Sequence, residues 1–439
     1  MNHQIRTIGL ATCVASCVLS VGVIPATAGS FGVNEHSASA QGASYAGVAA
    51  GGQLSSLFWN PAIMTQFSGM SFEISASGFF GEGKNNVTSV TPAGLGLIPY
   101  TPNDFLNDAL IPAIYASWQL SPQLWVGLSI NAPFGLSVSF PDAWPGRNYA
   151  QSTALKTYNA APTVAYRIND WLSVGVGLQI QYGSASLSNG LTFGVPFTSS
   201  LMLEGHGWGI GATAGLTLTP GPNTTVGIGW RSAVDQKISG NLVTPAVLGG
   251  TPGPASTTIK LPDIVTLGVR QRMNAQWTVM GTVEWSNWSR IGTSRVIQGN
   301  GAAAIAAGGV PLIFPFQYRD GWLFSGGFEY GWRPDTTLRA GLGYEISPVY
   351  DAVRTPRIPD ANRVWLSGGL THTLLKNLKL DLAYSHLFVD KAAIAVQPGN
   401  PWFTGVTYIG TATGSIDIIS VGLKYQFEPP ASLPLIRKG

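Results

Sequence analysis

The chain has very few cysteines and few charged residues, and each shortage excludes a class of protein. Cys13 and Cys17 are its only cysteines, and both fall within the first 28 residues. The rest of the chain therefore has no disulfide framework and no thiol chemistry. Charged residues make up only 10% of the sequence. Ordinary soluble domains carry roughly 25% charge, so this chain has too little polar surface for a water-soluble protein.

Long apolar runs are also missing once the N-terminus is passed. No stretch of about 18 or more apolar residues follows residue 28, which excludes a protein built from membrane-spanning helices. The net charge is only +3 and no basic cluster occurs, so no nucleic-acid partner is expected. Mean hydropathy is nevertheless positive. Transmembrane β-barrels combine these properties, because their lipid-facing apolar residues alternate with small polar ones.

Residues 1–28 have the pattern of a secretory signal peptide. Arg6 supplies the positive charge, Ile8 to Ile24 is apolar, and Ala26-Thr27-Ala28 forms the cleavage pattern. We therefore expect a mature chain that begins near Gly29 and is exported to the bacterial outer membrane. The alternative is an uncleaved anchor helix, for which the apolar run is short.

From Ser71 onward, apolar and polar residues alternate in segments of about ten residues. Leu172 to Tyr182 is the clearest example, with apolar residues at even positions and Ser, Gly or Gln at odd ones. We predict an all-β fold, a transmembrane antiparallel β-barrel of about fourteen strands spanning residues 71–427. The expected strands start near Ser71, Ala113, Leu124, Thr153, Trp171, Leu201, Thr225, Asp263, Gln276, Gly321, Thr336, Arg363, Leu378 and Ser415.

Short turns and long connections alternate along these segments. Asn169-Asp170 and Lys376-Asn377 are examples of short turns, and Ser232 to Pro262 is a long connection. Outer-membrane barrels sort their loops in this way, with periplasmic turns on one rim and extracellular loops on the other. Tryptophans near strand ends are expected to form aromatic girdles at the two membrane interfaces. They are Trp118, Trp125, Trp171, Trp230, Trp285, Trp288, Trp322 and Trp332.

Residues 29–70 fit neither the strand pattern nor a helical one. They are rich in Gly, Ala and Ser, and their apolar residues recur with no sustained period. Such a segment cannot bury its own apolar groups. We predict that it forms a plug, or hatch, inside the barrel; the alternative is a flexible tail.

The third expected strand contains a break. Apolar residues occupy even positions from Leu124 to Ile130 and again from Leu136 to Phe140, on either side of a short interruption. Proline removes a backbone donor, and the nearby glycine tolerates a bulge. We predict a kink that opens the lumen sideways to the bilayer, at Ala132, Pro133, Phe134 and Gly135. An apolar molecule would then reach the membrane without entering water. The alternative is that Pro133 ends a short strand at a loop.

Several motifs, in this order along the chain, carry a family resemblance. They are Phe31-Gly32-Val33-Asn34-Glu35, Trp59-Asn60-Pro61-Ala62, Leu261-Pro262-Asp263, Tyr318-Arg319-Asp320 and the segment from Arg357 to Ser367. Over essentially the whole mature chain, the sequence resembles the FadL/TodX outer-membrane transporters of long-chain fatty acids and aromatic hydrocarbons. The resemblance implies ligand capture by extracellular loops, an interior pocket beside an N-terminal hatch, and lateral exit through a kinked third strand.

The resemblance also implies roles for single residues. Phe31 and Val33 would line the interior pocket, and Arg319 would be a basic position for a ligand carboxylate. The hatch or gate would contain Asn34, Glu35, Asn60, Pro61 and Ala62, with the last three lying against the strand gap. The segment from Gln179 to Ser186 lacks the arginine that the family pattern places there, which leaves room for an uncharged hydrocarbon. Residues 428–439 form a tail beyond the expected terminal aromatic residue, Phe427.

These features favour a passive, non-enzymatic uptake channel for hydrophobic molecules, with no cofactor and no metal. Its expected partners are a hydrophobic small molecule, outer-membrane lipid and the barrel-assembly machinery, and the protein is expected to be a monomer. A general porin or adhesin is one alternative, although the scattered inward charges such as Arg270, Glu329 and Arg339 also fit salt bridges across the interior. A barrel hydrolase is the other; the mature chain has four histidines, far apart and without a nucleophile motif.

Overall fold

The computed structural model describes residues 30–91, 104–190, 200–243, 253–298 and 312–427. The expectations for residues 1–28 and 428–439 lie outside these ranges. The strands are β1 (Met70–Thr91), β2 (Ala109–Gln119), β3 (Leu124–Asn131), β4 (Gly135–Ser139), β5 (Ser152–Arg167), β6 (Leu172–Gly190), β7 (Ser200–Gly221), β8 (Thr224–Arg231), β9 (Val234–Val243), β10 (Gly253–Leu261), β11 (Ile264–Arg272), β12 (Trp277–Ser286), β13 (Thr293–Gln298), β14 (Leu312–Pro315), β15 (Gly321–Arg333), β16 (Thr336–Ile346), β17 (Arg363–Leu375), β18 (Leu378–Val389), β19 (Ala392–Val396) and β20 (Thr407–Phe427). The helices are α2 (Ala38–Gln41) and the 3₁₀ turns η1 (Val48–Ala50), η2 (Leu54–Phe58), η3 (Pro61–Gln66) and η5 (Trp288–Ile291).

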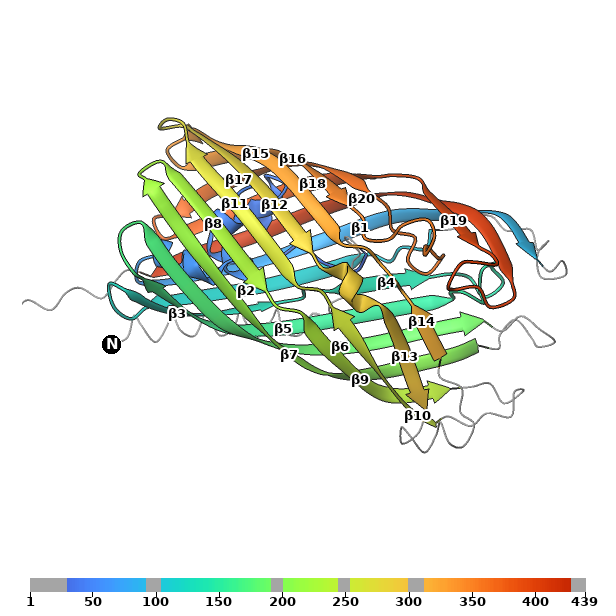
Figure 1. Ribbon diagram of the computed structural model, residues 1–439. Coiled ribbons are helices and arrows are strands. Elements are labelled where there is room, and N and C mark those ends of the chain that lie inside the picture. The colour runs from blue at the N-terminus through green and yellow to red at the C-terminus, as the bar shows by residue number, and fades with distance from the viewer. Residues whose placement is uncertain (1–29, 92–103, 191–199, 244–252, 299–311, 428–439) are drawn as a thin grey trace, which may run out of the picture.

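Within the described residues, these segments form a closed antiparallel barrel of fourteen strands (Figure 1). β1 and β20 pair from Met70↔Phe427 to Thr91↔Thr407, which joins the first strand of the sheet to the last. Several barrel strands consist of two segments because the chain bends between them; the third, for example, is β3 followed by β4, and both segments pair with β5. The predicted fold is therefore confirmed.

Asparagines define the short turns at one end of the barrel. The side-chain oxygen of Asn169 accepts hydrogen bonds from the amides of Trp171 and Leu172, at 3.0 and 2.8 Å. Asn274 does the same for Gln276 and Trp277, at 2.9 Å each. Asparagine favours such positions because its side chain replaces a backbone acceptor in a tight turn.

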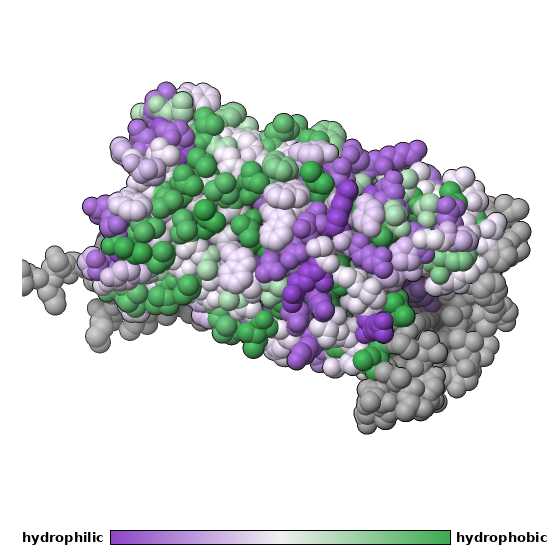
Figure 2. All heavy atoms as spheres, in the orientation of Figure 1, coloured by the Kyte–Doolittle hydropathy of each residue, from purple (hydrophilic) through white to green (hydrophobic). Residues whose placement is uncertain are grey.

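The outer wall is apolar where it faces lipid. In β6, Val174, Val176 and Leu178 are exposed, whereas Ser173 and Gln179, which flank them at odd positions, are buried. Figure 2 shows hydrophobic residues gathered over the half of this face that carries β8, β11 and β12, bounded on both sides by hydrophilic residues. A band of this kind matches the hydrocarbon layer of a bilayer. None of the helices in the described part of the chain has the length and apolar character needed to cross a membrane.

Several of the tryptophans predicted to form girdles are exposed, whereas two are buried. Trp118, Trp171 and Trp332 are exposed on the outer wall. Trp125 and Trp288 are only 1% and 4% exposed and point inward. Trp125 donates a hydrogen bond from its ring nitrogen to the Phe67 carbonyl oxygen at 2.7 Å, at the end of the plug. Trp288 lies in η5, where the chain leaves the wall between β12 and β13.

Residues 30–69, called the hatch from here on, lie inside the barrel and are almost entirely buried (Figure 1). Inward-facing glycines leave room for the hatch backbone. A Cβ atom on Gly227 would lie 1.8 Å from the Ala49 carbonyl oxygen, and one on Gly229 would lie 1.8 Å from that of Trp59. The glycines in the strands thus leave room in the lumen for the backbone of the hatch.

Several of the inward charges form ion pairs. Glu329 bridges two arginines, at 2.5 Å to Arg270 and 2.8 Å to Arg339. Arg270 also touches the hatch, because its guanidinium lies against Gly52. These charges tie neighbouring strands together beneath the hatch.

Candidate functional site

The wall of the barrel is interrupted beside Pro133. Pairing between β2 and β3 ends at Ile114↔Ile130. Beyond that point, residues 109–113 of β2 pair with β1 on one edge, and the described residues provide no strand partner on the other. Contact with the third barrel strand resumes only at the bridge Leu106↔Val138. The kink is therefore a gap in backbone pairing rather than the end of a strand at a loop.

The kink also reverses which side chains face the interior. β3 and β5 pair at Asn131↔Asn159, and β4 and β5 pair at Gly135↔Lys156. Between these pairs the third barrel strand advances four residues while β5 advances three. A one-residue slip moves side chains to the opposite face. Leu128 is accordingly exposed to lipid, whereas Leu136 and Val138, at positions of the same parity, are buried.

The N-terminus of the hatch pairs with the kink. The Val33 amide donates a hydrogen bond to the Pro133 carbonyl oxygen at 3.0 Å, and the Gly135 amide donates to the Phe31 carbonyl oxygen at 2.9 Å. Gly32 and Phe134 form the bridge between them. The hatch thus pairs with backbone groups of the third barrel strand that have no partner in β2. Such pairing matters where little water is available to replace the missing strand.

Three aromatic rings meet at this junction. The ring of Phe31 lies 4.6 Å from that of Trp288 and 6.4 Å from that of Phe134, and Phe134 and Trp288 are 5.9 Å apart. All three contacts are edge-to-face, a favourable arrangement for aromatic rings. Each ring comes from a different part of the chain: the hatch, the kink and η5.

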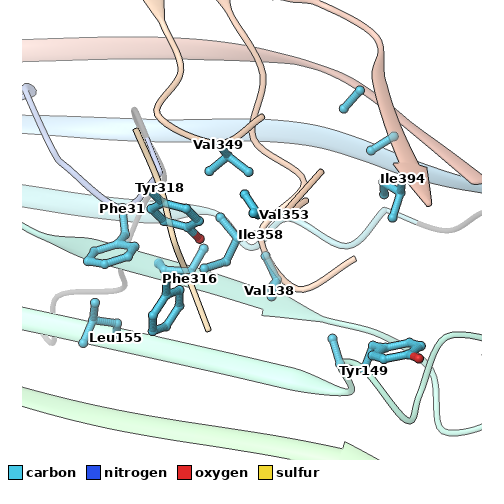
Figure 3. Close-up of a cluster of buried hydrophobic side chains, with 14 of the residues drawn as sticks. Phe31, Val138, Tyr149, Leu155, Phe316, Tyr318, Val349, Val353, Ile358 and Ile394 are labelled. Atoms are coloured by element: carbon cyan, nitrogen blue, oxygen red, sulfur yellow. The ribbon is translucent and has the colours of Figure 1, made fainter. Parts of the chain in front are cut away.

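This junction is continuous with a larger apolar cluster that reaches the long connections between strands. Figure 3 shows its side chains converging from the hatch, β4, β5 and three connections between strands. Those labelled include Phe31, Val138, Leu155, Phe316, Tyr318, Val349, Val353 and Ile358. Phe31 is the hatch residue in this cluster, so it connects the loops to the break in the wall.

Arg357 fixes the loop that covers this cluster. It lies in the connection 347–362 between β16 and β17 and is 2% exposed. Its guanidinium donates to the carbonyl oxygens of Tyr149, Ser152 and Ser188, at 3.0, 3.1 and 3.2 Å. Burial lowers the pKa of Arg357 to about 10, which still leaves it charged at neutral pH. The loop is therefore held across the barrel mouth against β5 and β6.

Two cavities flank the hatch N-terminus. The loop-side cavity has an empty volume of about 550 Å³, which includes space open to solvent. Its lining includes Ser30, Leu136, Val138, Asp360, Arg363 and Asp390. The kink cavity has an empty volume of about 470 Å³, again including open space. Its lining includes Val33, Pro133, Phe134, Glu284, Trp288 and Glu345. Phe31 lies between Ser30, in the first cavity, and Gly32 and Val33, in the second.

Glu35 and His36 follow in the fully buried part of the hatch. Burial raises the pKa of Glu35 to about 7, against the opposing effect of backbone amide donors and with a further rise from Glu345. Burial and the positive charge of Arg231 lower the pKa of His36 to about 3. Within the described part of the chain, Glu35 Oε1 has no hydrogen-bond partner. Asn34 contributes its amide, which donates to Glu35 Oε2 at 2.8 Å.

Two expectations about position are wrong. Asn60-Pro61-Ala62 does not lie at the strand gap: Asn60 Nδ2 donates to the Leu216 carbonyl oxygen in β7 at 2.9 Å, and a Cβ on Gly175 of β6 would contact Pro61 and Ala62. Gly175 is near the turn end of β6, whereas the kink lies level with Gln181. Arg319 is exposed, and its guanidinium lies 5.7 Å from the Tyr350 ring rather than inside either cavity.

The sequence analysis missed the breaks that bring Trp288 inward. The wall also bends at Ser232-Ala233, at Pro262-Asp263 and at 287–292. Asp263 joins the first two of these bends, because its side chain accepts a hydrogen bond from the Ala233 amide at 3.0 Å. The sequence feature that could have predicted these bends is Pro262, which interrupts an otherwise alternating strand. In the described ranges, no group of three or more His, Cys, Asp or Glu side chains is arranged to hold a metal ion.

Comparison with known proteins adds the following findings. The sequence profile of the family described as "outer membrane protein transport protein (OMPP1/FadL/TodX)" matches residues 19–427. The long-chain fatty acid transport protein of Escherichia coli (strain K12) is 24% identical over 431 residues, which is 86% of this chain and 93% of that protein. The 47 kDa outer membrane protein of Pasteurella multocida (strain Pm70) is 26% identical over 431 residues, or 92% and 95% of the two chains.

Solved structures with the same architecture are also similar to this chain. A Pseudomonas aeruginosa FadL homologue superposes with a TM-score of 0.82 at 22% identity, covering 91% of this chain and 100% of that one. The P. putida toluene transporter TodX superposes with a TM-score of 0.63 at 17% identity, covering 86% and 94%. At these identities the likeness concerns the fold.

Proposed function

Because the chain belongs to the outer membrane protein transport family that includes OMPP1, FadL and TodX, we propose that it is a passive uptake channel for hydrophobic molecules. Relatives named as a long-chain fatty acid transport protein and a toluene transporter suggest the two ligand classes. The channel acts in the bacterial outer membrane and performs no catalysis. It works as a monomer, after the assembly machinery has inserted it.

The break beside Pro133 carries this proposal. An apolar molecule gains free energy by staying out of water. A gap in pairing between β2 and β4, beside an apolar cluster, offers it a path from the lumen into the bilayer. The polar end of the barrel, filled by the hatch, is then not part of the route.

In this proposal the ligand is collected by the loop cluster, moves past Phe31 and leaves at Ala132 to Gly135. Phe31 and Val33 line the interior site, and the segment from Asn34 to Glu35 holds the hatch end in place. Asn60, Pro61 and Ala62 anchor the hatch to β6 and β7 rather than gating the gap. The proposed domains are 1–28 for the cleaved signal, 29–70 for the segment that contains the hatch, 71–427 for the barrel and 428–439 for a tail.

Direct binding and uptake test the proposal. The purified barrel should bind a radiolabelled long-chain fatty acid or toluene, and a deletion strain should take up less of the bound compound. The Phe31→Ala variant should weaken binding about tenfold, because it loses two aromatic contacts. Phe80→Ala, on the exposed outer wall, is the matched control. Absence of binding to both compounds, with unchanged uptake after deletion, would exclude the function.

A further inference from the structure

The two cavities beside Phe31 are lined by more acidic than basic side chains. Among the described residues, the kink cavity is lined by Glu284 and Glu345 and by no Lys, Arg or His. The loop-side cavity contains Asp360 and Asp390 against a single cation, Arg363. Whether each carboxyl group is ionised or neutral, none supplies a positive charge. In the part of the chain that the structure describes, Arg363 is therefore the only cation that lines either cavity.

Arg363 is already committed to protein carboxylates. Its side chain is 3% exposed, and Nη2 pairs with Asp360 Oδ1. Its Nε lies 3.6 Å from Glu345 Oε2, an ion-pair contact without a hydrogen bond to any described residue. The other oxygen of Asp360 accepts hydrogen bonds from the Ser30 amide, at 2.8 Å, and from the Ser347 hydroxyl. This network joins the hatch N-terminus to the wall, so freeing Arg363 for a ligand would break contacts that hold the hatch.

The remaining nearby charges do not supply a substitute. Arg231 faces the hatch from β8, but its guanidinium donates to the Phe58 carbonyl oxygen at 3.0 Å and to the Gln179 side chain. Arg319 is exposed beyond the cavities. Glu35, which interacts electrostatically with both Glu345 and Arg363, adds another carboxyl group with an unpartnered oxygen.

An ionised carboxylate moved into this site would lose its hydration without gaining a cation, and it would face fixed groups of its own sign. A neutral apolar molecule meets neither cost. We infer that the interior site takes uncharged hydrophobic molecules and discriminates against ionised fatty acids. This inference rests on the proposed function and names the substrate class of the same site.

A matched pair of ligands tests the inference. Octan-1-ol and octanoate have the same chain length, and octanoate is ionised at about pH 8, as carboxylic acids are well above their usual pKa. Equilibrium dialysis against the native barrel, with a detergent-only blank, measures both; the binding that Phe31→Ala removes is assigned to the interior site. We expect octanol to bind at least about tenfold more tightly than octanoate, a difference of about 1.4 kcal/mol.

Two variants then identify the cause. Asp360→Asn should free Arg363 and raise octanoate affinity about tenfold with little change for octanol. Asp170→Asn, in a turn at the opposite end, is its control. If Asp360→Asn does not assemble, Glu345→Gln removes a second partner of Arg363, and Glu204→Gln, exposed on β7, is the control.

The outcomes separate the inference from the function on which it rests. Octanoate bound at the interior site as tightly as octanol overturns the inference and leaves an uptake channel for fatty acids. Variants that leave the octanol-to-octanoate ratio unchanged overturn the role given to the acidic side chains. Failure of both ligands to bind, while toluene or a long-chain fatty acid still binds, overturns the inference and leaves the proposed function.

Discussion

The amide of Val33 donates a hydrogen bond to the carbonyl oxygen of Pro133 across 3.0 Å, so the hatch pairs with the strand that breaks the wall. An unpaired strand edge in a membrane is costly, since no water replaces the missing partner. Here the plug supplies the partner from within the lumen. The position of the hatch N-terminus and the state of the opening are therefore linked through the same backbone groups.

A disulfide between residues 32 and 134 should close this opening. The hydrogen bonds of residues 31 and 33 flank the Gly32↔Phe134 bridge, which makes it a non-hydrogen-bonded pair with Cα atoms about 4.5 Å apart, suitable for a disulfide. The described chain contains no competing cysteine. We expect the oxidised Gly32→Cys/Phe134→Cys variant to take up hydrophobic ligand at least about tenfold more slowly, and reductant to restore the rate.

The reduced double variant is the control for loss of the Phe134 ring, and Gly32→Cys alone is the control for the new thiol. Full cross-linking, verified by mass spectrometry, with undiminished uptake would show that the hatch N-terminus does not gate the route.

The fold follows from sequence because a lipid-exposed barrel obeys simple alternation. Val174, Val176 and Leu178 face lipid and Gln179 faces inward because strand side chains repeat every two residues. Pro133 indicated the kink for a similar reason, because proline has no backbone N–H to donate to a neighbouring strand. Rules that depend only on neighbouring residues were sufficient for these features.

The site required information that the local pattern does not contain. Leu136 keeps the parity of Leu128, yet a one-residue register shift turns it to the interior, and only the partner strand reveals that shift. Trp288 resembles a girdle tryptophan in sequence, but η5 brings it onto Phe31. Likewise, the pairing of Arg363 with Glu345 as well as with nearby Asp360 depends on how β16 and the start of β17 meet.

The inward glycines should be required for the hatch to fit. A Cβ on Gly229 would lie 1.8 Å from the backbone oxygen of Trp59, so Gly229→Ala must displace the hatch main chain. Overpacking of this kind costs about 1–3 kcal/mol. We expect the variant to lose its folded band on unheated gels at a lower temperature than the native barrel. Gly326→Ala, whose Cβ would have no neighbour within 4 Å, is the control. Equal melting of the two variants would contradict the tight fit.

Stability of the closed hatch should fall as pH rises, because of Glu35. Its pKa is raised from 4.5 to about 7 by burial and by Glu345, and lowered less strongly by Arg363 and by backbone donors. A carboxyl group with a raised pKa binds its proton more tightly in the closed state, so the closed state weakens between about pH 4.5 and pH 7. His36, with its pKa lowered to about 3, stays neutral throughout that interval.

In planar bilayers, we expect hatch-opening events to be more frequent at about pH 8 than at about pH 5. The free energy of hatch opening should fall by up to about 3 kcal/mol over this interval. Glu35→Gln should remove most of this dependence by holding the site neutral. Glu82→Gln, exposed in β1, should keep it. A pH dependence that survives in Glu35→Gln would assign it to another group.

Asn60 should anchor the middle of the hatch through its amide donors. The side chain is fully buried, and Nδ2 donates to the carbonyl oxygens of Ala49 and Leu216, at 2.7 and 2.9 Å. Asn60→Asp keeps the size and the acceptor but loses the donors, and each orphaned buried carbonyl costs about 1–3 kcal/mol. We expect proteinase K to cleave the hatch of this variant faster while the barrel strands remain protected, with fragments identified by mass spectrometry. Asn169→Asp is the matched control, because that exposed side chain acts only as an acceptor for Trp171 and Leu172. If the hatch of Asn60→Asp resists proteinase K as well as that of the native protein, packing against β6 and β7, rather than these hydrogen bonds, holds the hatch.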